Sequence, residues 1–181
     1  MIRDFSAQPK PQNSKAKTVM LVFFVVAAIC LISSAIMQSY KGVVGMVGIG
    51  ALTTAILMYT KYISVKFHYD VLADGLEEPL FVVRQTTGKR EVTLARVALA
   101  DIVDVKRETA AERKAHKRDK TTSLYVYAPT LFPEVSYRMY VRTRYEVSEI
   151  ILEGSDEFFS KIKEFSVEAR AARQALDDEE Y

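Results

Sequence analysis

The chain lacks most of the residues from which catalytic and metal centres are built. Its 181 residues include no tryptophan, one cysteine and two histidines. The single cysteine, Cys30, excludes an intrachain disulfide. There is no glycine-rich phosphate loop, G-x-S-x-G, C-x-x-C or H-E-x-x-H motif. His68 and Asp70 are two residues apart, so on a strand they could share one face and supply two metal ligands. No third ligand is indicated. We therefore expect no catalytic residue, no metal site and no cofactor.

Charge is absent from two long apolar runs near the N-terminus, Thr18–Met37 and Gly42–Tyr59. Only the tetrad Gln38-Ser39-Tyr40-Lys41 separates them. A bilayer's hydrocarbon core is about 30 Å thick and needs roughly 20 apolar helical residues to cross it. Within lipid, only a helix satisfies its backbone hydrogen bonds segment by segment. The pattern predicts a transmembrane helical hairpin over residues 18–61, and its lack of intramembrane charge argues against a transporter or proton relay.

Basic residues flank the hairpin unequally. The connection carries only Lys41, whereas the flanking segments carry Arg3, Lys10, Lys15, Lys17, Lys61 and Lys66. Because positive residues prefer the cytoplasmic side, we expect a multi-pass protein of the cytoplasmic membrane with both termini in the cytoplasm. The alternative is a signal peptide cleaved near Ser33-Ser34-Ala35, which would leave one span and reverse the orientation of the remainder. The length of the first run and the second run that follows it argue against cleavage.

Glycine is scarce, and four of the seven glycines lie in the second run. Small residues recur there at helical spacing: Gly45, Gly48, Ala51 and Ala55. Such a face lets helix backbones approach closely in lipid. Ala28 and Ala35, one heptad apart in the first run, offer a matching face. Two interpretations stay open, namely packing within the hairpin and self-association between copies as a homo-oligomer.

The pattern changes after Tyr62 from helical runs to short β segments. They are rich in Val, Ile, Tyr, Phe and Thr, and turn residues separate them. We expect strands at Tyr62–Leu72, Pro79–Thr86, Arg90–Ala95, Asp101–Arg107, Ser123–Ala128, Ser136–Thr143 and Tyr145–Leu152. Thr87-Gly88-Lys89 is expected to close a hairpin between the second and third of these strands.

A helix is expected after the strands. Ser155 is a suitable N-cap, and apolar residues then recur at helical spacing until about Gln174. They are Phe158, Phe159, Ile162, Phe165 and Ala169. The expected domains are a basic N-terminal tail (1–17), the hairpin (18–61), one cytoplasmic domain (62–175) and an acidic, disordered tail (176–181).

Seven strands followed by one amphipathic helix is the element order of a pleckstrin-homology (PH)-like fold. The chain resembles bacterial PH-like membrane proteins, in which a membrane hairpin precedes such a domain. The local similarity is a strand, Arg90–Leu94, followed by the segment Leu99–Val105, whose form is apolar-x-x-Ile-x-x-Val. The resemblance implies an α+β membrane protein, with a seven-stranded β-barrel or sandwich capped by a C-terminal helix.

A basic segment links two of the expected strands. Residues 106–120 hold seven basic residues against three acidic ones: Lys106, Arg107, Arg113, Lys114, Lys117, Arg118 and Lys120. Long loops are often functional, and a basic loop near the inner leaflet attracts anionic lipid headgroups. In PH-like domains, phosphoinositides bind at the first strand-to-strand loop, but here that loop, Ala73–Glu78, is acidic. The segment is a candidate lipid- or partner-binding site, with a solvated charged loop as the alternative.

A second basic group, Arg138, Arg142 and Arg144, is interleaved with Tyr140 and Tyr145. Basic and aromatic residues together can bind nucleic acid. The net charge of +2 and the expected attachment to a membrane favour a structural role instead, in which these basic residues pair with Glu146 on adjacent strands. No nucleic acid partner is therefore expected.

The function expected from the sequence is that of a noncatalytic membrane protein. Its PH-like domain would serve as a protein-interaction or scaffold module on the bilayer. One alternative is a membrane-surface sensor that binds anionic headgroups through residues 106–120. Another is an accessory subunit of a membrane transport or enzyme complex.

Overall fold

The computed structural model describes residues 4–9, 14–36, 40–73, 78–117, 121–143 and 146–179. The chain divides into two compact units. Gln12–Val65 form a helical unit, and Met1–Pro11 together with Lys66–Tyr181 form a β-rich unit. The protein is therefore α+β, with two apolar helices followed by two β-sheets and a C-terminal helix.

Both apolar runs are helices. Helix α1 spans Ser14–Ile36, and α2 spans Lys41–Met58 and continues into a π-helical turn at Tyr59–Ile63. Their hydroxyl groups bond within the helices: Ser34, Thr53 and Thr54 each donate to a carbonyl three or four residues earlier at 2.9 Å. These side chains thus find partners in an otherwise apolar surface.

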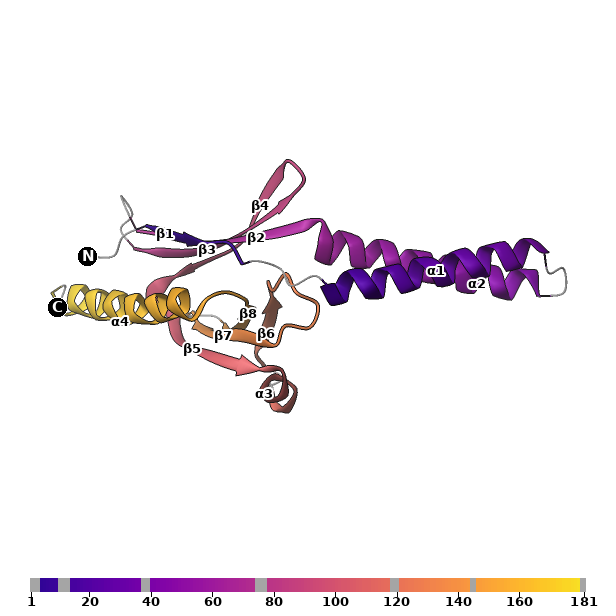
Figure 1. Cartoon of the computed structure of the whole chain (residues 1–181). Helices are drawn as coiled ribbons and strands as arrows, with labels where there is room; N and C mark the ends of the chain where they lie inside the picture. Colours follow the sequence, from indigo (N-terminus) through magenta and orange to yellow (C-terminus); the bar gives the residue numbers. More distant parts are fainter. Residues whose placement is uncertain are drawn as a thin grey trace. The chain divides into compact units, whose positions relative to one another are not determined.

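The β-rich unit contains two four-stranded sheets (Figure 1). The first has the order β1-β2-β3-β4, with β1 at Phe5–Ala7, β2 at Val65–Leu72, β3 at Leu80–Thr87 and β4 at Arg90–Ala98. The second has the order β5-β7-β8-β6, with β5 at Ile102–Thr109, β6 at Ser123–Val126, β7 at Val135–Arg142 and β8 at Val147–Leu152. All seven expected strands are present, within a few residues of their expected ends.

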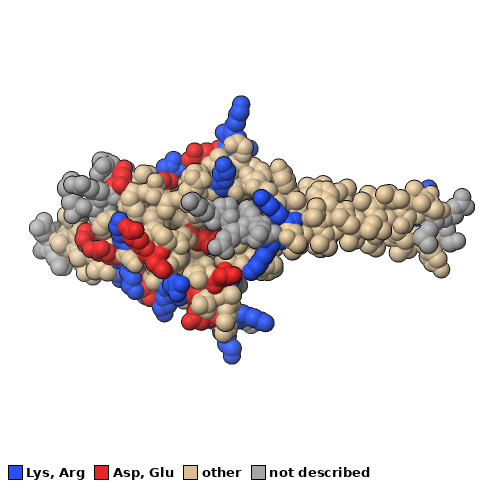
Figure 2. Space-filling view, in the orientation of Figure 1, with Lys and Arg blue, Asp and Glu red and all other residues tan. Residues whose placement is uncertain are grey.

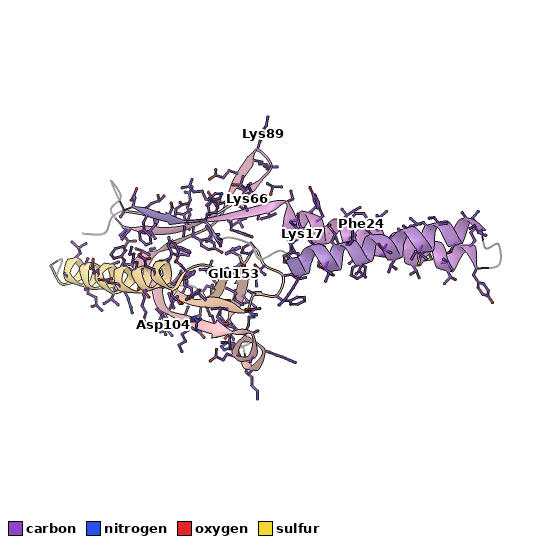
Figure 3. The ribbon with its side chains drawn as sticks, viewed as in Figure 1. Lys17, Phe24, Lys66, Lys89, Asp104 and Glu153 are labelled. Carbon is purple, nitrogen blue, oxygen red and sulfur yellow. The ribbon has the colours of Figure 1, made fainter. Side chains whose placement is uncertain are left out.

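The pairs β1–β2, β3–β4, β5–β7 and β7–β8 are antiparallel, whereas β6 and β8 run parallel. The expected hairpin joins β3 to β4, where Thr87 pairs with Arg90. Gly88 has a φ of 62°, a left-handed conformation that glycine adopts without strain. The tip of this hairpin, where Lys89 stands, extends beyond the other strands of its sheet (Figures 1 and 3).

The N-terminal segment is more than the basic tail expected for residues 1–17. Its residues Phe5–Ala7 form β1 and pair antiparallel with β2, so that Ser6 lies opposite Asp70. The Phe5 ring packs edge-on against Phe158 and Phe165, with centroid distances of 5.2 and 5.5 Å. A three-residue strand is too short to show the alternation by which strands are predicted. Its partner lies beyond the whole helical hairpin in the sequence.

The C-terminal helix packs against both sheets through consecutive phenylalanines. Phe158 contacts Tyr69 on β2, and Phe159 stacks on Tyr137 of β7 at a centroid distance of 4.0 Å. Of the five residues of the expected apolar face, Phe158, Phe159, Ile162 and Ala169 are buried and Phe165 is half-buried. The main core lies between the two sheets and this helix.

The N-terminus of helix α4 agrees with the expectation, but its C-terminus does not. Helix α4 spans Asp156–Glu179, and the Ser155 hydroxyl accepts from the Phe158 amide at 3.3 Å as expected for an N-cap. The helix was expected to end near Gln174 and residues 176–181 to be disordered, yet residues 175–179 are helical. No glycine or proline interrupts residues 171–179, so nothing in the sequence ends the helix.

Candidate functional site

The small-residue face of α2 packs against α1 within the same chain. Gly48, Ala51 and Ala55 are buried. A Cβ atom built on Gly48 would lie 3.0 Å from Leu31 Cγ and 3.2 Å from the Cys30 Cβ, whereas one on Gly45 would lie 3.7 Å from the Ser34 hydroxyl oxygen. Among the glycines of α2, Gly48 therefore lies closest to α1.

The matching face of α1 differs from the expected one. Ala28 and Ala35 are exposed, whereas Ala27 is buried and Cys30 and Ser34 are half-buried. Ala28 and Ala35 do share one face of α1. That face is rotated by about 100°, the angle between consecutive helix residues, from the face on which Ala27 lies. The face that contacts α2 is formed by residues 27, 30 and 34, which are spaced three and four residues apart.

The basic segment is not a single loop. Strand β5 continues to Thr109, and α3 follows at Ala110–Ala115. The Thr109 hydroxyl accepts from the Glu112 amide, and the Glu112 carboxylate accepts from the Thr109 amide, which forms a capping box. The Thr109 amide and hydroxyl both donate to the Glu112 carboxylate, and these two bonds lower the pKa of Glu112. The long connection expected from residue 106 is therefore a strand end, a short helix and a few further residues.

Lys106 and Arg107 lie on opposite faces of β5, because side chains alternate along a strand. Lys106 stands over the Tyr140 ring, 5.4 Å from its centroid. Arg107 pairs with Asp156 at 3.2 Å, and Asp156 also accepts from the Tyr137 hydroxyl. Burial and this bond to Asp156 raise the pKa of Tyr137 to about 12.

The other basic residues of the segment also differ in their surroundings. Arg113 donates to the Ser136 hydroxyl at 2.6 Å and to the Pro133 carbonyl at 2.8 Å, so it fastens α3 onto β7. Lys114 and Lys117 are exposed and make no hydrogen bond or ion pair with any described residue. Arg118 and Lys120 lie outside the described residues.

A buried ion network lies on the sheet face beneath α3. Arg138 on β7 donates to Glu108 at 2.8 Å and to Glu149, and His116 lies 3.4 Å from Glu149. The side chains of Arg138, Glu108 and Glu149 are only 3%, 10% and 6% exposed. Burial lowers the pKa of Arg138, but the two carboxylates outweigh burial and raise it.

The structural interpretation of Arg138 is thus supported with different partners. Glu146 was expected, but the register places Arg138 opposite Ile151 on β8 and Lys106 on β5. Glu108 and Glu149 lie two residues away along the flanking strands, diagonal to Arg138 and on the same face of the sheet. Arg142 is exposed, and Arg144 and Tyr145 lie outside the described residues.

Two shallow hollows open on the β-rich unit. One, of about 410 Å³, is lined by Val105, Arg107, Tyr137, Asp156, Phe159, Ser160 and Lys163. Its cations are paired, Arg107 with Asp156 and Lys163 with Asp104 at 2.9 Å, and the bond from Lys163 lowers the pKa of Asp104. The other, of about 430 Å³, lies over β3 and β4 and contains Arg84, which pairs with Glu91.

The His68 and Asp70 pair does not form part of a metal cluster. Asp70 pairs with Arg84 at 3.0 Å. Across the described ranges, no three His, Cys, Asp or Glu side chains are grouped so that they could hold a metal ion.

Figure 2 shows basic and acidic side chains intermixed over the β-rich unit, whereas the helical unit is almost free of them. No protein-family model matches the chain, and no curated protein matches it. The functional interpretation therefore depends on the residues and geometry of this chain.

Sequence reasoning missed two features. The first is the ion network, because its members come from three strands and α3. The second is the stretch 121–133, which has no charged residue and yet exposes Tyr125, Val126 and Phe132. Its lack of charge is visible in the sequence and was the signal that could have identified it.

The native cysteine allows a direct test of the helix packing. In Gly48→Cys the new Cβ lies 3.2 Å from the Cys30 Cβ, close to the spacing of about 3.5–4.5 Å that a disulfide needs. We expect oxidation in membranes to give an intrachain disulfide, measured as loss of maleimide labelling without a change in mass on a gel. In the control Gly50→Cys, whose Cβ meets no atom within 4 Å, both thiols should remain reactive. Efficient disulfide-linked dimers of Gly48→Cys would instead favour contact between copies.

Removing the central cation of the ion network should destabilise the fold. Arg138→Met leaves two buried carboxylates without their partner, which typically costs about 3–5 kcal/mol. Urea unfolding of the detergent-solubilised chain, followed by tyrosine near-ultraviolet circular dichroism, measures this loss. Arg142→Met on the same strand is exposed and should change stability by less than about 0.5 kcal/mol. Adding Glu108→Gln and Glu149→Gln to Arg138→Met should recover part of the loss, and equal effects at 138 and 142 would contradict a buried network.

Proposed function

We propose that this chain is a noncatalytic membrane protein whose helical hairpin anchors the β-rich unit at the cytoplasmic face of the cell membrane. The pairing of β1 with β2 is the observation that carries the proposal. Ala7, which precedes the hairpin, lies opposite Tyr69, which follows it. Both ends of the hairpin therefore return to one folded unit, so both must lie on the same side of a bilayer that the helices cross.

The surface of the helical unit supports the anchoring role. Large apolar side chains face outward along both helices, among them Leu21, Phe24, Ile32, Met46, Ile49 and Leu57 (Figure 3). Only 6% and 17% of the most apolar windows of the two helices are buried, which argues against a pair of core helices in a soluble protein. Exposing so large an apolar surface to water is unfavourable, whereas lipid accommodates it.

Orientation follows from the flanking charges. The excess of lysine and arginine outside the hairpin favours a cytoplasmic location for both ends and for the β-rich unit. The β1–β2 pair also argues against a cleaved signal peptide. Cleavage near Ala35 would remove β1 and leave Phe158 and Phe165 without the Phe5 ring.

The β-rich unit is proposed to be PH-like. Two packed sheets and a C-terminal amphipathic helix support that assignment, and so does the agreement with the seven expected strands. Two details depart from the simple pattern: β1 comes from before the hairpin, and β6 pairs parallel with β8.

Its proposed role is that of a protein-interaction or scaffold module. Strand β4 is last in its sheet order, so one of its edges has no strand partner among the described residues, and Val92 and Leu94 on it are exposed. Unpaired strand edges commonly receive a strand from another protein. The alternative of a charge sensor at residues 106–120 is less well supported, because Lys106, Arg107 and Arg113 already have partners. A subunit of a larger transport or enzyme complex would be one form of the same scaffold role.

Topology reporters test the anchoring. Reporters fused before Met1 and after Tyr181 should both give a cytoplasmic signal, because the β1–β2 pair and the flanking charges hold both ends on one side. A reporter inserted at Ser39 should give an external signal. Termini on opposite sides, or a cytoplasmic signal at Ser39, would contradict the proposal.

Photocrosslinking in intact membranes tests the interaction role. A photoreactive residue replacing Val92, which is 42% exposed, should give protein adducts, since it lies on the free edge of β4. The matched control replaces Val167 on α4, which is 55% exposed and lies on no strand edge. Adduct masses distinguish a second copy from another protein. Equal yields of adducts at both positions, or none, would count against β4 as the interaction edge.

A further inference from the structure

The stretch 121–133 is unusual within the β-rich unit. It contains no charged residue, although charged residues make up 27% of the chain. It comprises β6 and the turn that leads towards β7. Four of its large apolar side chains are exposed, and we refer to them as the β6 patch: Leu124 (37%), Tyr125 (41%), Val126 (56%) and Phe132 (62%). Because side chains alternate along a strand, Leu124 and Val126 lie on one face of β6 and Tyr125 on the other, so these three flank the open edge of the strand.

The β6 patch is firmly connected to the start of β2. Tyr125 stacks on Tyr127 at a centroid distance of 6.2 Å, and Tyr127 lies 6.4 Å from the Phe67 ring. The Tyr69 hydroxyl donates to the Tyr127 carbonyl at 2.7 Å and accepts from the Glu153 amide at 3.4 Å. Burial raises the pKa of Tyr69, so its hydroxyl stays protonated and keeps this donor. Tyr125 is thus linked through Tyr127 to β2.

Chain length limits the distance between this site and the second candidate span. That span ends at Ile63, four residues before Phe67. Four residues reach at most about 14 Å even when fully extended. Phe67, whose ring lies beside Tyr127, is therefore no farther than this chain length from the last residue of the span, whatever conformation the connecting residues adopt.

The chemistry of the patch suits the boundary between headgroups and acyl chains. Tyrosine rings place an apolar body in the acyl region and a hydroxyl among the headgroups, and aromatic residues are enriched at that depth. The stretch has no charge to desolvate and none that would require an anionic lipid. Phe132 and Val126 can enter the acyl region without leaving an ionised group behind.

We propose that the β6 patch contacts the bilayer directly, as an uncharged interfacial contact that holds the β-rich unit against the membrane. The proposal rests on the anchoring function proposed above and adds a second, peripheral contact to it. The surface it requires is that of an ordinary neutral bilayer, so its contact is independent of anionic lipid. A second copy that covers the open edge of β6 is the competing occupant.

The absence of tryptophan makes a fluorescence test simple. Phe132→Trp or Tyr125→Trp in the full chain introduces the sole tryptophan, at a site that already carries an exposed aromatic ring. The variants are reconstituted in phosphatidylcholine vesicles, with and without phosphatidylglycerol. We expect a blue-shifted emission that is quenched by lipids brominated near the top of the acyl chain, equally in both compositions. Val167→Trp, at an exposed position on α4, should be neither shifted nor quenched.

A third reporter separates this proposal from the one on which it rests. Ile49→Trp, in the middle of α2 and 60% exposed, should be quenched by lipids brominated deep in the chain. If it is quenched and both patch reporters are not, the hairpin spans the membrane and the β6 patch proposal is wrong. If Ile49→Trp is not quenched, both proposals fail.

Two further outcomes would overturn the bilayer contact. A blue shift without bromolipid quenching, which disappears when the protein is diluted in excess lipid, assigns the patch to a second copy. Quenching that requires phosphatidylglycerol and is lost at high salt assigns the contact to the basic residues instead.

Discussion

Phe158 and Phe159, the third and fourth residues of α4, join the two β-sheets of this protein. Consecutive helix residues point about 100° apart, so the two rings can enter different layers. Phe158 packs against Phe5 and Tyr69 of the first sheet, and Phe159 stacks on Tyr137 of the second. Truncating a buried phenylalanine to alanine costs about 3–5 kcal/mol, a large share of the roughly 5–15 kcal/mol that stabilises a typical domain. These two rings therefore link both sheets to α4.

The same contact ties the chain before the hairpin to the chain after it. Phe5 belongs to β1, and its ring lies against Phe158 and Phe165 of α4. The hairpin is therefore an insertion between two neighbouring strands of one sheet, β1 and β2. An insertion of this kind must leave and re-enter on the same side of any bilayer that it crosses. The proposed anchoring function thus depends on packing inside the β-rich unit as well as on the apolar helices themselves.

The charges of the β-rich unit serve mainly to hold its own elements together. Arg138 bridges Glu108 and Glu149, Arg113 fastens α3, and Arg173 on α4 pairs with Glu78 and Asp101. Among the five basic residues of segment 106–120 that the structure describes, Lys106, Arg107 and Arg113 make internal contacts, whereas Lys114 and Lys117 are exposed. Two open features remain: the free edge of β4, where exposed Val92 and Leu94 lie on a strand that also carries charged residues, and the uncharged β6 patch. These features favour strand pairing and interfacial burial over electrostatic attraction as the ways in which the β-rich unit makes external contacts.

By itself, the sequence determined the elements with strong local signals. The uncharged runs of α1 and α2, seven strands, the Gly88 turn, the Ser155 cap and the apolar face of α4 all follow from periodicity, propensity and capping. Only the tertiary structure decided what those elements meet. It paired three residues at the N-terminus with a strand beyond the hairpin, placed Ala27 rather than Ala28 against α2, and gave Arg138 its two carboxylate partners. The physical reason is that local patterns act over a few residues, whereas register, helix-facing contacts and buried ion pairs depend on residues brought together only by the packed core.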